Sequence, residues 1–324
     1  MADLDDATRA KRLAGAARDA GWLELRSDGG GGDPLASGVE TSIVADALGA
    51  SVADVAFCGP VLAADLARRA GVTVGNAAVV AFAPSLIDIA LPAASTTSTP
   101  IYAVDGAGEG FDGAYVLVPD GATYRLGLVS LDGAERGSRW GSDLTRAVEV
   151  IGTGASVESI ADTPTPLTDD DRIAWTALGL ALTSADLVGI MRGVLDITVA
   201  YAAERRQYGV PVGSFQAVQH LLAEARCLVE GSHSAALHAS WAVDNLPPRE
   251  ALAAGRVAKA YCARAARTAC ETAVQVHGGV GNTWECIVHV YLRRALFSSR
   301  WFGDDREQLR ELQRERLEVT DGLP

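Results

Sequence analysis

Two segments in the second half of the sequence have the composition of a ligand-binding site. Residues 204–224 read Glu-Arg-Arg-Gln-Tyr-Gly-Val-Pro-Val-Gly-Ser-Phe-Gln-Ala-Val-Gln-His-Leu-Leu-Ala-Glu, which predicts a basic helix end, a Gly/Pro turn and a new helix opened by Ser214. Residues 275–281 read Gln-Val-His-Gly-Gly-Val-Gly and predict a helix that ends in glycines. Because glycine lacks a Cβ, a ligand can approach the backbone closely there. A basic helix terminus or a glycine cap would explain either segment alone, but the pair is more specific.

Other motifs of catalysis or phosphate binding do not fit. Residues 29–34 hold four glycines without a following Gly-Lys-Ser/Thr, which favours a flexible surface loop. Residues 106–110 are glycine-rich but lead into a β-favouring run, so we interpret them as a turn between strands. There is no G-x-S-x-G motif. No metal site is expected, because the histidines form no H-x-x-x-H or H-E-x-x-H pair: His220, His233, His238, His277 and His289.

The elements that position the two segments follow the order helices, strands, helices. Apolar residues at helical spacing predict helices over 37–50 and 61–70. Four β-favouring runs then follow, at residues 77–82, 101–104, 114–118 and 147–151. Helical spacing returns after residues 163–166, in 187–201, 215–243, 249–276 and 284–298, before a charged tail helix from Asp304. We predict a mainly α fold with a small central β-domain, divided into residues 1–71, 72–166 and 167–324.

Length, charge and cysteine content limit the remaining classes of protein. The chain has 324 residues, and 41 Asp+Glu against 28 Lys+Arg leave a formal net charge of -13, which argues against a nucleic-acid partner. The charge-free stretch 173–185 stops at Asp186, short of the roughly 20 residues of a membrane span. Residues 1–6 are acidic, unlike a signal peptide, so we expect a cytoplasmic protein. The odd, scattered cysteines predict buried free thiols: Cys58, Cys227, Cys262, Cys270 and Cys286.

Together the two segments resemble the C-terminal helical domain of the acyl-CoA dehydrogenases. The family motifs R-x-x-[FY]-G-x-P-[IV]-x-x-F-Q-A-x-x-H and Q-x-x-G-G-x-G match residues 205–220 and 275–281. The resemblance covers residues 187–312 and extends more weakly to residues 17–23, which resemble the family's Gly-Trp helix end. It implies a helical N-terminal domain, a β-domain and a C-terminal four-helix bundle, the first truncated and the second reduced.

The resemblance implies FAD as the cofactor and an acyl-CoA thioester as the substrate, oxidised to the 2,3-enoyl-CoA. In this family each flavin lies between two subunits, and the matched positions contact the pyrophosphate and adenosine of an FAD held mainly by the neighbouring chain. A guanidinium suits a diphosphate, and an amide suits the edges of ribose or adenine. The cofactor-binding positions implied here are Arg205, Gln207, Tyr208, Phe215, Gln216, Gln275, Gly278 and Gly279.

The catalytic glutamate of the family has no counterpart in this sequence. It removes the α-proton while the β-hydrogen leaves as hydride to the flavin. The family places it in a loop about two dozen residues after the Gly-Gly pair or near the start of the helix before Glu204, and gapless alignment puts Phe302 and Gly179 at these positions. Neither can accept a proton. Asp304 and Asp305 lie nearby, but a helix N-cap role suits them better.

The predicted β-region also lacks the family's aromatic-x-x-T-E-P-x-x-G-S-D and W-I-[ST] segments, which hold the isoalloxazine ring. We therefore expect the non-catalytic subunit of a heteromeric α₂β₂ acyl-CoA dehydrogenase, similar to the paired enzymes of actinobacterial steroid and cholesterol side-chain degradation. A catalytic partner would supply the glutamate and most of the flavin site, and electron-transfer flavoprotein would accept the electrons. Two alternatives remain: a self-sufficient homomeric dehydrogenase with Asp304 or Asp305 as base, and a non-redox scaffold or acyl-CoA-binding protein.

Overall fold

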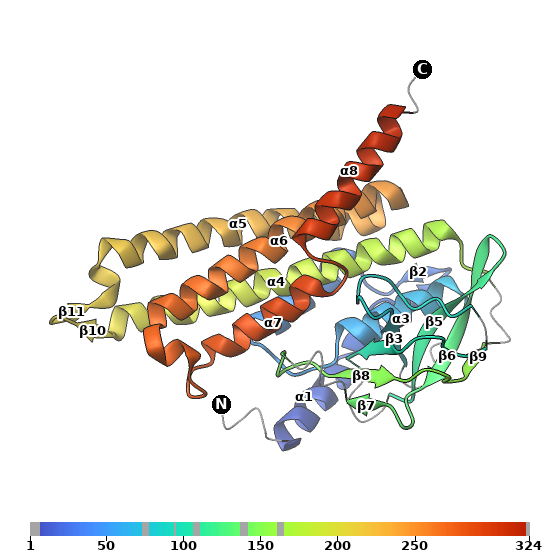
Figure 1. The fold of residues 1–324 in the computed structure, drawn as a ribbon, viewed down its shortest axis with the longest axis horizontal. Coiled ribbons are helices and arrows are strands. Elements are labelled where there is room, and N and C mark those ends of the chain that lie inside the picture. Colours follow the sequence, from blue (N-terminus) through green and yellow to red (C-terminus); the bar gives the residue numbers. More distant parts are fainter. Residues whose placement is uncertain are drawn as a thin grey trace.

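A long helical bundle lies beside a part built from short helices and a curled sheet in the computed structural model (Figure 1). The structure describes residues 7–72, 78–93, 95–105, 111–136, 142–160 and 165–321. Two of the interpreted segments, residues 1–6 and 106–110, lie outside the described residues. The order of helices, strands and helices predicted from the sequence is confirmed.

The N-terminal part packs short helices onto the bundle. Its elements are α1 (Ala7–Asp19), η1 (Trp22–Glu24), α2 (Gly38–Ala50) and α3 (Cys58–Arg69). A capping box starts α2, since the Ser37 hydroxyl accepts from the Glu40 N–H and the Glu40 carboxylate accepts from the Ser37 N–H. The four-glycine segment is not a flexible loop. It forms an antiparallel hairpin, because Gly30, Gly31 and Gly32 adopt the positive φ that its turn requires: β1 (Asp28–Gly30) and β2 (Asp33–Pro34).

The sheet has the strand order β7-β8-β4-β3-β5-β6-β9, with only the β3–β5 pair parallel among the described strands. Its strands are β3 (Ala78–Phe82), β4 (Ile101–Val104), β5 (Gly113–Asp120), β6 (Thr123–Ser130), β7 (Glu135–Arg136), β8 (Val148–Ile151) and β9 (Val157–Ser159). Sequence periodicity missed β6 because Gly127 interrupts its β-favouring run. A Cβ there would meet the Val116 and Val157 side chains at 3.0 Å, so the glycine serves strand packing.

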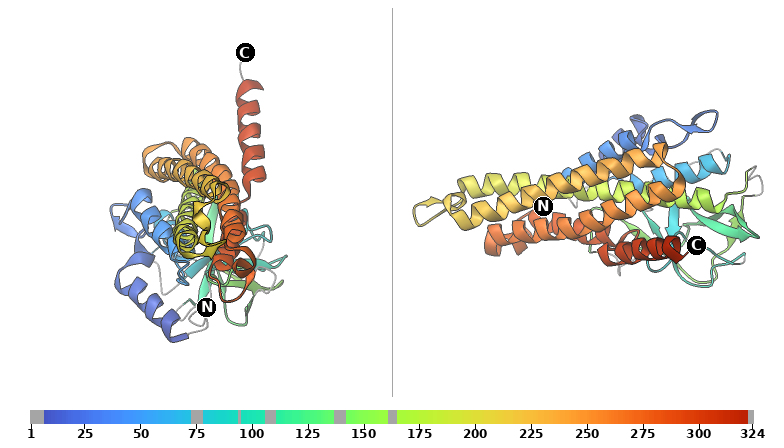
Figure 2. Two further views of the ribbon diagram at one scale, coloured as in Figure 1. Left: turned by 90° about the vertical axis from the view of Figure 1, so that its left-hand side faces the viewer. Right: turned by 90° about the horizontal axis from the view of Figure 1, so that it is seen from above.

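The bundle is built around α4, which extends across the molecule between α5, α6 and α7 (Figures 1 and 2). Its helices are α4 (Asp169–Glu204), α5 (Gln216–Asn245), α6 (Pro248–His277), α7 (Val288–Arg300) and α8 (Asp305–Asp321). The sequence placed two starts too early. Ser214 ends the 3-10 turn η3 (Val212–Ser214) instead of opening α5, and α7 begins at Val288 because the preceding residues follow the η4 turn (Gly278–Asn282).

Two further expectations, on a membrane span and on buried thiols, depend on burial. Within the described residues, α4 is long and apolar enough to cross a membrane once Asp186 is included, but 94% of its apolar window is buried inside the fold. All five cysteines are free, yet Cys227 is exposed and Cys286 is half-buried, so the prediction of buried thiols holds only for Cys58, Cys262 and Cys270. Among the described residues, no group of three or more His, Cys, Asp or Glu side chains could hold a metal ion.

Candidate functional site

The first motif segment folds as a hairpin at the end of α4. Strands β10 (Arg206–Gln207) and β11 (Val210–Pro211) pair antiparallel, and Tyr208 and Gly209 between them have φ of 53° and 83°. Positive φ at both central residues is typical of a type I′ turn. The Arg205 N–H donates to the Tyr201 carbonyl at 2.8 Å, and the Val212 N–H donates to the Arg205 carbonyl at 2.7 Å. The hairpin is thus fixed at both ends to the helix terminus.

The second motif segment ends α6 in the η4 turn. Gly278 has φ 63° and ψ -144°, a conformation open mainly to glycine, and its N–H donates to the Gln275 carbonyl. A Cβ at Gly278 or Gly279 would meet no atom within 4 Å, so the space above this turn is open. By contrast, a Cβ at Gly281 would lie 2.9 Å from the Val274 carbonyl oxygen, which assigns that glycine to packing.

The fold brings the two segments to the same end of the bundle, because α4 and α6 run in the same direction (Figure 1). All eight predicted cofactor-binding residues are exposed there. The Tyr208 side chain is 94% exposed, and its ring meets the Phe215 ring edge-on, with centroids 6.5 Å apart. Within the part of the chain that the structure describes, no carboxylate pairs with the Arg205 guanidinium. This end therefore presents an uncompensated cation, amides, aromatic rings and open backbone.

An aromatic group that no sequence motif indicated lies on the segment that follows η4. Trp284 is 62% exposed, and the Arg293 guanidinium lies 5.5 Å from its ring centroid. The buried His289 ring meets Trp284 edge-on at 5.1 Å, and neither of its ring nitrogens has a hydrogen-bond partner among the described residues. Burial, followed by the charge of Arg293, lowers the pKa of His289. The only sequence signal was a tryptophan shortly after the glycine turn.

The two positions where the family resemblance places a catalytic glutamate lie against each other. A Cβ added at Gly179, on α4, would collide with Cζ of the Phe302 ring. Phe302 is 1% exposed and has φ 65°, which is rare for a bulky side chain. Its N–H donates to the Leu86 carbonyl at 2.9 Å, and the Gln308 amide donates to its carbonyl. These bonds hold the backbone in the conformation that turns the ring onto Gly179.

Aromatic side chains fill the space around this contact. The Phe302 centroid lies 5.2 Å from that of Phe82 and 5.5 Å from that of Trp175. Trp301 lies 5.8 Å from Phe302 and 5.7 Å from Phe82. These distances are those of favourable tilted and edge-to-face pairs. The region is therefore a packed aromatic core without a proton acceptor at either expected position.

Asp304 has the structural role that the sequence favoured. Its carboxylate accepts from the Glu307 N–H at 3.0 Å and caps the first turn of α8. Asp304 is exposed, whereas Phe302 is buried. Asp305 is the first residue of α8 and is half-buried.

Asp186, a buried carboxylate on α4, also has a structural role. Asp186 accepts from Arg294 at 2.7 Å, Arg146 at 3.0 Å and the Ser298 hydroxyl at 2.7 Å. Burial opposes its charge, but the two guanidiniums hold the pKa of Asp186 below its ordinary value. Arg146 also lies over the Trp301 ring at 5.4 Å. This ion cluster joins the sheet region to α4 and α7. Because the pKa of Asp186 is lowered, its carboxylate is a poor base.

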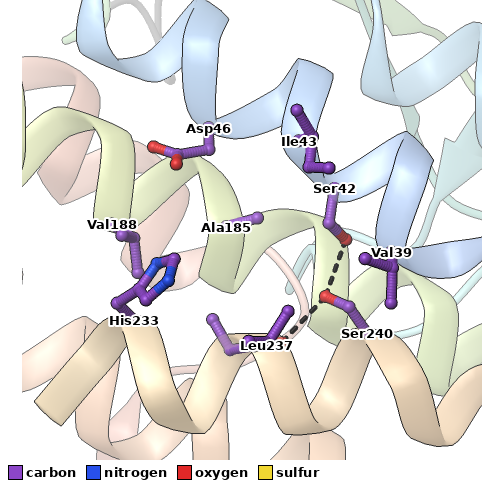
Figure 3. A pocket seen from close by; sticks show the side chains of 10 residues that line it. Val39, Ser42, Ile43, Asp46, Ala185, Val188, His233, Leu237 and Ser240 are labelled. Carbon is purple, nitrogen blue, oxygen red and sulfur yellow. Dashed lines mark hydrogen bonds between the residues drawn. The ribbon is translucent and has the colours of Figure 1, made fainter. Parts of the chain in front are cut away.

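A separate cleft lies between α2, α4 and α5 (Figure 3). Its cavity volume is about 50 Å³ between mostly apolar walls, with a 2.8 Å hydrogen bond between Ser42 and Ser240 across one side. At its other side Asp46 pairs with Arg192 at 2.9 Å, while burial raises the Asp46 pKa. None of the predicted cofactor-binding residues and neither expected glutamate position lines this cleft.

Comparison with known proteins identifies the helical part. Residues 175–317 match the family "Acyl-CoA dehydrogenase, C-terminal domain". The bundle therefore matches the C-terminal domain of the acyl-CoA dehydrogenases. "Acyl-CoA dehydrogenase IpdE2" of Mycolicibacterium smegmatis is 37% identical over 173 residues, which are 53% of this chain and 50% of that protein. "Acyl-CoA dehydrogenase FadE34" of Mycobacterium tuberculosis is 38% identical over 135 residues, 42% and 19% of the two chains. The alignments thus span half or less of these relatives.

Solved structures show that the rest of the chain shares the acyl-CoA dehydrogenase fold. A variant of the "Tcur3481-Tcur3483 steroid ACAD" superposes with a TM-score of 0.74 at 22% identity, covering 98% of this chain and 90% of that chain. The "ChsE4-ChsE5 complex from Mycobacterium tuberculosis" gives 0.72 at 22% identity, with 99% and 92% covered. The predicted fold class is confirmed.

FAD is the cofactor that the family indicates, and an acyl-CoA dehydrogenase from Bacillus anthracis "complexed with FAD" has a TM-score of 0.73 at 14% identity, covering 99% of this chain and 66% of that chain. The bundle end fits part of such a group. The Arg205 guanidinium suits a diphosphate, Gln275 and Gln216 supply amides, and the open turn at Gly278 admits it against the backbone.

Proposed function

We propose that this chain is the non-catalytic subunit of a heteromeric acyl-CoA dehydrogenase and completes an FAD site whose larger part lies on a catalytic partner. The observation that carries the proposal is the Phe302 ring packed on Gly179. The two positions at which the family carries its base meet in one closed aromatic core, and neither side chain can accept a proton. The motif positions that reach a neighbour's flavin remain exposed.

In this proposal the chain contributes binding and the partner contributes chemistry. Arg205 neutralises the diphosphate charge, and Gln207, Gln216 and Gln275 donate to the adenosine and ribose portion. Gly278 and Gly279 let the diphosphate approach the backbone, while Tyr208 and Phe215 cover its apolar surfaces. FAD, when bound, accepts the hydride from the acyl β-carbon. The partner's carboxylate removes the α-proton.

The finer assignments are part of the same proposal. We place the substrate among steroid-type acyl-CoA thioesters, a class supported by the description of the Tcur3481-Tcur3483 neighbour. We propose an α₂β₂ assembly, supported by the ChsE4-ChsE5 complex as a structural neighbour. Electron-transfer flavoprotein as the acceptor and a cytoplasmic location complete the proposal.

The test is to purify the chain alone and after co-expression with an acyl-CoA dehydrogenase encoded beside it. We expect the single chain to be colourless and without dye-linked activity, and the complex to be yellow and active. Arg205→Ala should lower the flavin content of the complex without preventing assembly. Asp196→Ala, on α4 outside the proposed site, is the matched control and should leave the flavin content unchanged.

Two results would overturn the proposal. A yellow, active homomer from this chain alone would establish the self-sufficient dehydrogenase. If the flavin content and activity of the complex are unchanged by both Arg205→Ala and Gln275→Ala, the non-redox scaffold is favoured. Structure already weighs against the first alternative, because Asp304 is engaged as the α8 cap.

A further inference from the structure

A half-buried stacking contact joins the helix ends that carry the two segments. The rings of Tyr201, near the end of α4, and His277, the last residue of α6, are nearly parallel at 20°, with centroids 4.2 Å apart. His277 is buried, and its Nδ1 lies 2.9 Å from the Ala273 carbonyl oxygen. This contact fixes the imidazole to its own helix. A residue that packs on the ring is therefore held against the end of α6.

Tyr201 makes a hydrogen bond to each segment. Its backbone carbonyl accepts from the Arg205 N–H at 2.8 Å, and its hydroxyl donates to the His277 carbonyl at 3.4 Å. The first bond sets where the hairpin leaves α4. The second satisfies one of the carbonyls that a helix terminus leaves unpaired, immediately before Gly278. Tyr201 therefore links the two segments, through its backbone carbonyl to the basic hairpin and through its side chain to the glycine turn.

We propose that Tyr201 is a positioning residue that fixes the distance between Arg205 and the Gly278–Gly279 turn, so that one diphosphate-containing ligand meets both. The inference rests on the proposed function, because it assumes that the two segments share a ligand. Preorganisation is the physical reason: a cation and a backbone turn held apart at the correct spacing bind without first paying the entropy of ordering. Tyr201 itself need not touch the ligand.

Two substitutions separate the ring from the hydroxyl. Tyr201→Leu removes both the stacking and the hydrogen bond, and we expect the Kd of the complex for FAD to rise about tenfold. Tyr201→Phe keeps the ring and should raise the Kd by about two- to fivefold, since it removes one neutral hydrogen bond. The matched control is Tyr261→Leu, because Tyr261 is a tyrosine of α6 that packs on Gly231 and contacts neither segment.

The measurements are FAD titration of the apo complex by flavin fluorescence, and amide hydrogen exchange of residues 275–281 without flavin. We expect both Tyr201 variants to weaken FAD binding in the order Leu, then Phe, and to speed exchange at the turn. Tyr261→Leu should change neither. Tyr201→Phe preserves the packing volume. If Tyr201→Leu destabilises the bundle, the Kd and exchange of Tyr201→Phe decide the outcome.

The outcomes distinguish this inference from the proposed function. A raised Kd for Arg205→Ala together with unchanged Kd and exchange for both Tyr201 variants would overturn the positioning role and leave the proposed function standing. A lowered Tm for Tyr201→Leu with an unchanged Kd would reduce the pair to ordinary packing. Unchanged flavin binding in both Arg205→Ala and Gln275→Ala would overturn the proposed function, and with it this inference.

Discussion

The two regions marked by the family motifs differ in the most basic property of a site, which is access. At the bundle end, Arg205 and Gln275 face open space, and a Cβ on Gly279 would meet nothing within 4 Å. Between α4 and the start of α8, Phe302 covers Gly179 and leaves no room for a single methyl group. The same residue type, glycine, thus leaves open space in one region and accommodates a packed ring in the other. The contrast supports the proposal that this chain assists a neighbour's site and has no open site of its own at these positions.

The largest expected effect comes from removing the ring that closes the core. Phe302→Ala should destabilise the chain by about 4 kcal/mol, because it removes a buried aromatic side chain and leaves a cavity between Phe82 and Trp175. The measurement is urea unfolding of the purified chain. The folded complex should keep its activity per flavin. Loss of that activity without loss of stability would place catalysis in this region and contradict its interpretation as a closed core.

A smaller loss is expected when the two glycines receive the same substitution. Gly179→Ala should cost about 2 kcal/mol, since the collision with Phe302 exceeds the gain in helix propensity. Gly279→Ala should change stability by less than about 0.5 kcal/mol but lower the flavin content of the complex. Unfolding curves and flavin absorbance measure both variants. Equal effects on stability would show that the two regions do not differ in packing.

A buried lysine beside the Asp186 ion cluster should also make stability depend on pH. Lys259 on α6 is fully buried and donates to the Ser298 carbonyl, and burial lowers its pKa to about 7 from an ordinary 10.5. Between these values the unfolded chain holds a proton that the folded chain lacks, so this residue makes stability rise with pH by up to about 1.4 kcal/mol per unit.

The check is the difference in unfolding free energy between Lys259→Met and the unaltered chain. The variant should be the more stable at pH 7, and its advantage should shrink toward pH 9. A constant difference over this range would mean that Lys259 is charged in the fold.

A further substitution, with a small expected effect on stability, tests the alternative base. Asp304→Ala should cost about 1 kcal/mol, the typical value of an N-cap, because it removes the bond to the Glu307 N–H. Turnover by the complex should stay unchanged. A fall in kcat of a hundredfold or more, with normal flavin content, would make Asp304 the base and refute the closed-site interpretation.

Local patterns predicted much of the fold. The α5 and α6 helices and the C-terminal half of α4 follow from apolar spacing, whereas the start of α4 at Asp169 was not predicted. The two motif segments were found because each is contiguous in the sequence. Strand β6 was missed, since Gly127 is explained only by the side chains of neighbouring strands. The exposure of Cys227 was missed for a similar reason: composition describes average burial, whereas its place on the outer face of α5 is decided by what packs beside it.

By itself, the sequence determined the order of helices and strands and the absence of a carboxylate at Phe302 and Gly179, and it predicted the residues that would meet a diphosphate. Only the tertiary structure decided that these two positions touch, and that Tyr201 links the hairpin to the turn at His277. The physical reason is that such contacts join helices that are distant in the chain. Periodicity specifies which face of a helix is buried, but only packing selects the partner that covers it.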